Sequence, residues 1–198
     1  MPSIPATKKN SNDLRRDPAG RRGQTLVEAL VALTILTTGF VGITTLLTKS
    51  FQLNRLTADE TQATYLAAEG IEVTKNIIDY DVYSGIAGGG NGASGWDASF
   101  SQNGYYALDY SSTSTVGTFS GSAPNSPLYF NSSTDFYELN DAPGDAPTDF
   151  TRNIYVKNKP VSGSPGGRMI DVQSTVTWSN GITSNSITLE DQFYDWHP

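Results

Sequence analysis

The segment that decides the fold is RRGQTLVEALVAL, at residues 21–33. Two arginines and a glycine open it, and the chain then stays apolar from Leu26 to Leu47, with Glu28 as the one charged residue of that run. A helix rises about 1.5 Å per residue, so these roughly 22 residues extend about 33 Å, enough to cross the hydrocarbon core of a bilayer. The segment therefore predicts a membrane-spanning helix near the N-terminus.

Charge is distributed unevenly around this segment. Residues 1–23 hold six basic and two acidic side chains, whereas residues 24–198 hold seven basic and 18 acidic ones. A basic stretch directly before an apolar run is typical of a targeting sequence, and the basic end stays in the cytoplasm. The apolar part of a cleaved secretory signal peptide usually has about 7–15 residues. Because this run is longer, we expect the helix to remain in the mature protein.

The composition of the 198-residue chain limits its chemistry. There is no cysteine, which excludes disulfides, thiolate metal sites and cysteine nucleophiles. His197 is the single histidine and lies next to the C-terminal residue, so imidazole catalysis is close to excluded. Thirteen lysines and arginines are too few for a surface that wraps nucleic acid. We therefore expect no enzyme, no cofactor and no clear nucleic-acid binding.

Glu28 does not fit an ordinary membrane anchor. A carboxylate inside the bilayer costs about 2.5–3.5 kcal/mol on insertion scales, so it is rarely accidental. One interpretation is an interfacial glutamate near the start of the helix, where the helix dipole favours negative charge. The other is a functional carboxylate, and the residues around Glu28 favour this second interpretation.

Residues 21–33 resemble the class III signal of type IV prepilins and pseudopilins, which has a basic leader, a glycine at the cut and an apolar helix with glutamate as its fifth residue. The resemblance implies that prepilin peptidase cuts after Gly23 on the cytoplasmic side and makes Gln24 the mature N-terminus and the candidate for N-methylation. It also implies that Glu28 recruits each subunit into a filament. Gln24 differs from the phenylalanine or methionine that the family usually has at this position.

The next residues, TILTTGFVG at 34–42, are most similar to the minor pilins called pilus modification proteins, which have two glycines three residues apart. Gly39 and Gly42 occupy these positions. Each glycine costs about 1 kcal/mol of helix stability relative to alanine. We therefore expect the helix to bend or loosen here when it leaves the membrane.

Beyond Leu47 the helical pattern becomes amphipathic. Apolar and small residues recur at steps of three and four, which predicts that this part of the helix packs one face on a globular head. The sequence thus divides into a leader (1–23), a helix (24–79) whose membrane or filament-core part is 24–47 and whose amphipathic part is 48–79, and a head (80–198). The stripe consists of Leu56, Ala63, Leu66, Ala67, Gly70, Ile71, Thr74, Ile77 and Ile78.

The head has the pattern of an antiparallel sheet. Its clearest feature is a hairpin, in which Ile170–Trp178 and Ser186–Tyr194 flank a turn at residues 179–181. The fold class is therefore α+β, with a long N-terminal helix packed on a C-terminal antiparallel sheet, which is the pilin-like layout. The other predicted strands are Tyr105–Tyr110, Leu128–Asn131, Phe136–Leu139 and Asp149–Lys157.

Chemical motifs in the head are weak. Three carboxylates, Asp141, Asp145 and Asp149, cluster in a loop and are a weak candidate for calcium, with a solvated acidic turn as the alternative. No activated nucleophile accompanies the acidic residues of the last strand. Tyrosines could form a sugar-stacking surface, although packing within the sheet is the commoner role of tyrosine. These tyrosines are Tyr105, Tyr106, Tyr110 and Tyr129.

Three functions fit the sequence. The first is a structural subunit, of the minor type, of a type IV pilus-like filament. The second is a pseudopilin of a type II secretion or competence system, and the third is a membrane-anchored surface-binding protein that never polymerises. The resemblance implies as partners other pilin subunits through the N-terminal helix, prepilin peptidase, the inner-membrane assembly platform, and membrane lipid before assembly. It places the chain as a single-pass protein of the cytoplasmic membrane with an extracytoplasmic head, and then in a cell-surface filament.

The first prediction concerns processing. Because Gly23 provides the small residue at the cut, Gly23→Arg should leave the leader attached and keep the chain in the membrane. N-terminal sequencing of the wild-type protein should begin at Gln24. A mature N-terminus at any other residue would contradict this assignment.

Overall fold

The structure is a computed structural model, and it divides into two compact units, Met1–Leu53 and Asn54–Pro198, each described here by itself. Helix α1, Ala19–Ala87, contributes to both. The structure describes residues 19–87, 95–112, 118–119, 126–139, 141–161, 167–179, 181 and 183–195, and the leader residues 1–18 lie outside this set.

Helix α1 is longer than the predicted helix 24–79 at both ends. It begins directly after Pro18, a residue that is tolerated only at or before the first turn of a helix. It ends at Ala87, directly before three consecutive glycines in the sequence. The prediction stopped too early because residues 80–87 include weak helix formers such as Asp81, Ser84 and Gly85. Contacts with distant residues support the helix here, since Asp81 accepts hydrogen bonds from Ser99.

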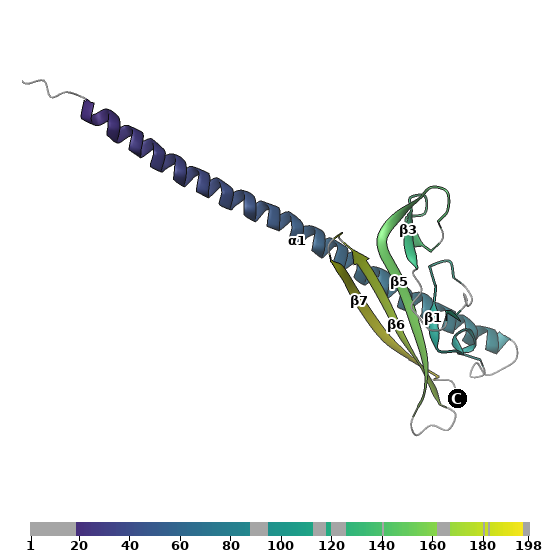
Figure 1. The fold of residues 1–198 in the computed structure, drawn as a ribbon. Coiled ribbons are helices and arrows are strands. Elements are labelled where there is room, and N and C mark those ends of the chain that lie inside the picture. The colour runs from purple at the N-terminus through teal and green to yellow at the C-terminus, as the bar shows by residue number, and fades with distance from the viewer. Residues whose placement is uncertain are drawn as a thin grey trace, which may run out of the picture. The chain divides into compact units, whose positions relative to one another are not determined.

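The strands form one seven-stranded antiparallel sheet in the second unit. Figure 1 shows the long strands β5, β6 and β7 as neighbours beside the second half of α1. One edge of β5 pairs with β6 from Phe150 to Pro160, while its other edge pairs with β3 and then with β1. The elements are η1 (Ala98–Phe100), β1 (Gly104–Tyr106), β2 (Thr118–Phe119), β3 (Pro127–Asn131), β4 (Phe136–Glu138), β5 (Asp145–Pro160), β6 (Arg168–Ser179) and β7 (Ser184–Tyr194).

The predicted α+β class, its pilin-like layout and the terminal hairpin are confirmed. In that hairpin Val176 pairs with Ile187, and Ser179 pairs with Ser184 on either side of the turn. The strand predicted at Tyr105–Tyr110 ends at Tyr106, and β2 was missed because two residues carry no pattern. Strand β5 also extends beyond Asp149–Lys157, since it includes prolines at both ends that read as breaks in the sequence.

The hydrophobic core lies between the second half of α1 and the sheet, in two clusters. The predicted helical stripe provides the α1 side of both clusters, with two differences. Leu56, which belongs to the stripe, is 40% exposed, and Val73, which does not, is buried. The first cluster contains Val73, Ile77, Ile78, Trp96, Phe100, Tyr106, Leu108, Ile154, Val156, Ile170 and Val172. The second contains Ala63, Leu66, Ala67, Leu128, Phe150, Val176 and Trp178.

At Gly70, α1 approaches the sheet closely. A Cβ atom on Gly70 would overlap Ser174 Oγ of β6 and would lie 3.2 Å from Ile154 Cδ1 and 3.3 Å from Arg152 Cδ. Ala67, one turn before, and Thr74, one turn after, are fully buried on the same face. This row of small residues brings the helix backbone against the strands.

Arg152 crosses the contact between helix and sheet. Its side chain is buried, and its two terminal nitrogens donate to Leu66 O at 3.1 Å and Leu108 O at 2.8 Å. Its Nη1 also lies 3.3 Å from Glu69 Oε1. One cation thus joins α1, β5 and the segment after β1.

The second prediction is that the head and its helix fold without the apolar segment. A fragment that lacks residues 1–50 keeps the second unit and its two core clusters, and should be a soluble, acidic, folded monomer. Circular dichroism and size-exclusion chromatography check this. An aggregated or unfolded product under mild conditions would contradict the packing of the stripe on the sheet.

The third prediction tests the close approach in the same fragment. Gly70→Val should lower the free energy of unfolding by at least about 1–3 kcal/mol, because the added side chain overpacks a tight contact. The matched control is Ala68→Val, at an exposed position two residues earlier, which should cost under about 1 kcal/mol through helix propensity alone. Denaturant unfolding measures both, and equal losses for the two variants would show that the contact at Gly70 is unimportant.

Candidate functional site

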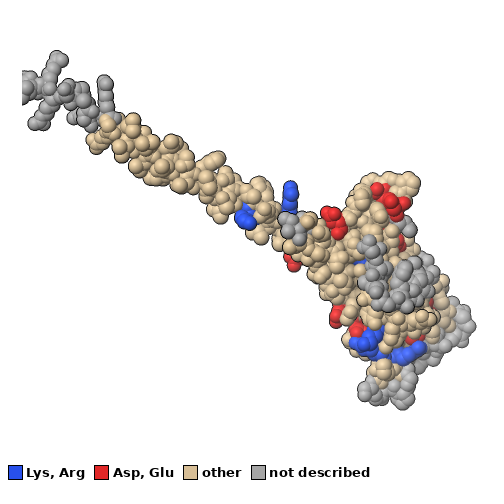
Figure 2. Space-filling model, in the orientation of Figure 1, with Lys and Arg blue, Asp and Glu red and all other residues tan. Residues whose placement is uncertain are grey.

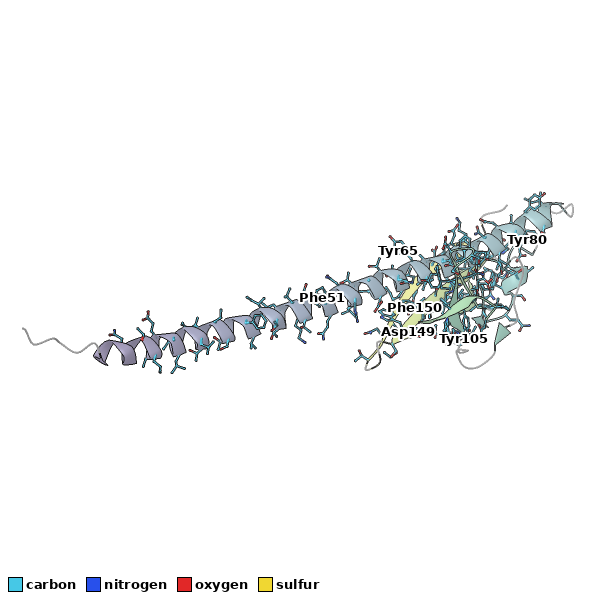
Figure 3. The ribbon with its side chains drawn as sticks, turned by 90° about the horizontal axis from the view of Figure 1, so that it is seen from above. Phe51, Tyr65, Tyr80, Tyr105, Asp149 and Phe150 are labelled. Atoms are coloured by element: carbon cyan, nitrogen blue, oxygen red, sulfur yellow. The ribbon has the colours of Figure 1, made fainter. Side chains whose placement is uncertain are left out.

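The candidate site is the part of α1 that belongs to the first unit. Every described side chain from Gly23 to Leu53 is exposed, and the large apolar ones include Leu36, Phe40 and Leu46 at 67–72% exposure. Figure 3 shows side chains projecting both above and below the helix before Phe51. A helix that is apolar all round normally has a partner or a lipid environment around it. This surface therefore indicates a lipid or protein environment around the segment.

Charge is almost absent from this surface. On the face that Figure 2 shows, no charged side chain is visible between the grey N-terminal atoms and the first blue side chains. In the sequence Glu28 is the one charged residue between Gly23 and Thr48. A helix long and apolar enough to cross a membrane lies within Gly23–Ile86, and its most apolar 18-residue window has a mean hydropathy of 2.0 with none of it buried.

The six threonines from Thr34 to Thr48 form hydrogen bonds to the backbone of their own helix. Each donates to a backbone carbonyl one turn earlier, at 2.7–3.1 Å; examples are Thr34 to Val31 O and Thr45 to Val41 O. Inside a bilayer no water is present to pair with a hydroxyl, so such bonds remove the cost of burying it. The same holds for Thr37, Thr38, Thr44 and Thr48. These bonds were not predicted from the sequence, although threonine in an apolar run is a signal for them.

The predicted processing and assembly residues lie on this helix. Gly23, Gln24 and Glu28 are all helical and exposed, and Gln24 and Glu28 are four residues apart, so they share one face. The helix also continues through Gly39 and Gly42, where an added Cβ would meet no atom within 4 Å. Packing within the chain therefore does not require these two glycines, and their role in bending stays a prediction.

One comparison with known proteins bears on this segment. The family model for the prokaryotic N-terminal methylation motif matches residues 18–44. The chain carries a type IV prepilin-type signal. The match covers Gly23, Glu28 and most of the apolar run, and it supports a type IV pilin-like or pseudopilin protein. The motif is typical of a family of structural subunits. The signal and the apolar helix agree with anchoring in a membrane, followed by incorporation into a surface filament. The signal also implies, in general terms, that the chain interacts with prepilin peptidase and with other pilin subunits. No curated protein and no solved structure matches the chain.

The acidic residues proposed for calcium do not come together. Asp141 and Asp149 are exposed, and Asp145 Oδ2 accepts a hydrogen bond from the Ala142 N–H at 2.9 Å within the turn before β5. Among the described residues, which include all three aspartates, no group of three metal-ligating side chains could hold a metal ion.

The four tyrosines proposed as a sugar-stacking surface have contacts within the head. Tyr106 is buried in the core against Phe100, while Tyr105 packs on Tyr155, with ring centroids 4.9 Å apart. Tyr110 stacks on Phe136 and donates to Glu138 Oε1 at 3.2 Å. Desolvation raises the pKa of Tyr106, and desolvation together with Glu138 raises that of Tyr110, so both hydroxyls stay neutral. Tyr129 pairs with Glu138 in the β3–β4 hairpin.

Buried carboxylates elsewhere in the head have structural partners. Asp81 on α1 accepts hydrogen bonds from Ser99 N–H at 2.8 Å and from its hydroxyl at 3.0 Å. Partial burial raises the pKa of the Asp81 carboxyl, the bonds from Ser99 oppose this, and the Asp97 carboxylate adds to it. Asp97 Oδ2 lies 2.8 Å from Arg168 Nη1. These groups fasten the end of α1 to the sheet and leave no free acid–base pair at that place.

Proposed function

We propose that this chain is a minor-type structural subunit of a type IV pilus-like filament. The observation that carries the proposal is an exposed helix, apolar on all sides, that bears one carboxylate and the prepilin-type signal. Such a surface is stable in lipid before assembly and against other subunits after assembly. A soluble binding protein has no use for it.

The chemistry of assembly begins with cleavage after Gly23. Cleavage creates an α-amine on Gln24, with a reference pKa of about 7.7–8.0, so it is largely cationic at neutral pH. In a low-dielectric filament core this amine attracts the Glu28 carboxylate of a neighbouring subunit and offsets the cost of burying that charge. The pair sets the axial register between subunits. An uncleaved chain lacks the amine and stays in the membrane.

Cleavage at this position requires the start of the helix to unwind. Gly23 and Gln24 both lie inside α1 rather than before it. A peptidase needs access to the peptide bond, so the first turns have to unwind at the cytoplasmic surface. Glycine lowers the cost of unwinding, because it is about 1 kcal/mol less favourable than alanine in a helix.

The minor role rests on the sequence around Gly39 and Gly42, which is similar to that of pilus modification proteins. A pseudopilin of a secretion or competence system would use the same cleavage and the same helix. The kind of filament that contains the chain distinguishes a minor pilin from a pseudopilin. An anchored protein that never polymerises would use the helix but would have no need of Glu28.

The fourth prediction separates the filament subunit from the simple anchor. Glu28→Ala should spare cleavage and membrane insertion, since removal of a charge favours the bilayer. It should block entry into filaments, because loss of one partner of a buried ion pair typically costs about 3–5 kcal/mol at each contact. The measurement is a blot of the sheared filament fraction at equal membrane levels of each variant.

The matched control is Glu60→Ala, which removes an exposed glutamate farther along the same helix and should leave incorporation unchanged. Equal amounts of wild type and Glu28→Ala in the sheared fraction would defeat the pairing mechanism. Absence of both from filaments would favour the anchor.

A further inference from the structure

A pocket of the second unit lies between α1 and the segment that follows β1. It has a volume of about 240 Å³. Pockets that hold drug-sized molecules usually measure about 300–1,000 Å³, so this one has room for a single small ring and not for a large ligand. Its lining consists of Val73, Asn76, Ile77 and Tyr80 of α1 together with Tyr110 and Ser112.

Two of the lining residues are tyrosines that keep much of their surface exposed. Tyr80 is 57% exposed and Tyr110 is 38% exposed. The Tyr110 ring is held in place, because it stacks on Phe136 with ring centroids 4.4 Å apart and its hydroxyl donates to Glu138 Oε1 at 3.2 Å. A ring that is already fixed loses little conformational freedom when a ligand packs on it. Tyr110 therefore offers aromatic contact at a low entropic cost.

The rest of the lining combines buried apolar groups with neutral polar ones. Val73 and Ile77 are buried. Asn76 is exposed, and its side-chain amide has both donors and an acceptor. The Ser112 hydroxyl donates to Asp109 Oδ1 and accepts from the Asp109 N–H, both at 3.1 Å, which orients it and leaves a second lone pair for another donor.

This lining favours a ligand that is neutral, partly apolar and able to form hydrogen bonds. None of the six described residues that line the pocket carries a charge, so an ionic ligand would lose water there without gaining a partner of opposite charge. A purely apolar ligand would remove water from the Asn76 amide and the Ser112 hydroxyl without replacing its hydrogen bonds. A sugar ring meets both demands, because its C–H groups form an apolar face and its hydroxyls donate and accept at its edge.

We propose that this pocket binds one neutral sugar residue of a glycan, a hexose or an N-acetylhexosamine. The apolar face of the sugar packs on the rings of Tyr80 and Tyr110, and its polar edge bonds to Asn76 and Ser112. Of the four tyrosines that the sequence suggested for sugar stacking, Tyr110 is the one that lines this pocket, and α1 provides the second ring. The site belongs to the head, so binding does not require assembly into a filament.

Saturation-transfer NMR on the full-length protein in lipid nanodiscs tests the proposal, because the method detects weak binding and the sample needs no sugar-based detergent. The probes are the methyl glycosides of glucose, galactose, mannose and N-acetylglucosamine, with N-acetylneuraminic acid as the anionic comparison. We expect at least one neutral glycoside to bind. Tyr80→Ala should weaken that binding about tenfold through loss of the ring contact, whereas Tyr80→Phe, which keeps the ring, should bind like the wild type.

The matched control is Tyr83→Ala, which removes a tyrosine that is 68% exposed, three residues farther along α1 and outside the pocket lining. It should leave binding unchanged, and circular dichroism checks that each variant keeps its fold. Four results would each overturn the site: no binding of any neutral glycoside, equal binding by Tyr80→Ala and the wild type, equal losses in Tyr80→Ala and Tyr83→Ala, or tighter binding of N-acetylneuraminic acid than of the neutral probes. None of them bears on incorporation into filaments, which is measured separately.

Discussion

The close contact at Gly70 is the constraint on which the head depends. Because a glycine stands opposite Ser174, the backbone of α1 lies against β6, and the side chains on either side can form two continuous clusters. Without that approach the apolar stripe of the helix would remain exposed, and so would the face of the sheet that packs against it. The hydrophobic gain from covering these side chains is what stabilises a sheet of this size.

The short distance also explains a charge in the core. Arg152 can reach Leu66 O only because the helix is close, and its other nitrogen satisfies Leu108 O. A buried cation is costly unless it is paired and hydrogen-bonded, and here it has two carbonyls and Glu69. The arginine thus ties together three segments that are far apart in the sequence.

One helix therefore serves two environments. Its second half is amphipathic and is held by the sheet, whereas its first half is apolar on all sides and keeps its threonine hydroxyls bonded to its own backbone. A single carboxylate, Glu28, interrupts that apolar surface. This division suits the proposed role, in which the subunit is held in a membrane before assembly and then packs against other subunits.

The sequence was sufficient for the features that depend on periodicity and composition. The apolar run, the stripe around Leu66 and Ile77, and the hairpin after Arg168 follow from spacings of 3.6 and 2 residues, and the structure has them all. It was not sufficient for features that depend on pairing between distant segments. Nothing local marks Arg152 as buried, separates Tyr106 from Tyr105 or shows that the three aspartates near β5 stay apart.

A groove along α1 from Asn54 to Glu69, with Tyr137 as one wall, belongs to the same class of feature. Thr57 and Ala58 are unremarkable in the sequence, and only the position of Tyr137 from a distant strand makes them the floor of a groove. Prediction from sequence therefore identified the segment that carries the proposed assembly chemistry and left the contacts of the head to the structure.

The central claim is that the chain is built into filaments, and immunoelectron microscopy of intact cells tests it most directly. Antibodies raised against residues 54–198 recognise the head without the apolar segment. The account predicts gold label on the filaments themselves. Label confined to the cell envelope, on cells whose filaments are present and unlabelled, would contradict it.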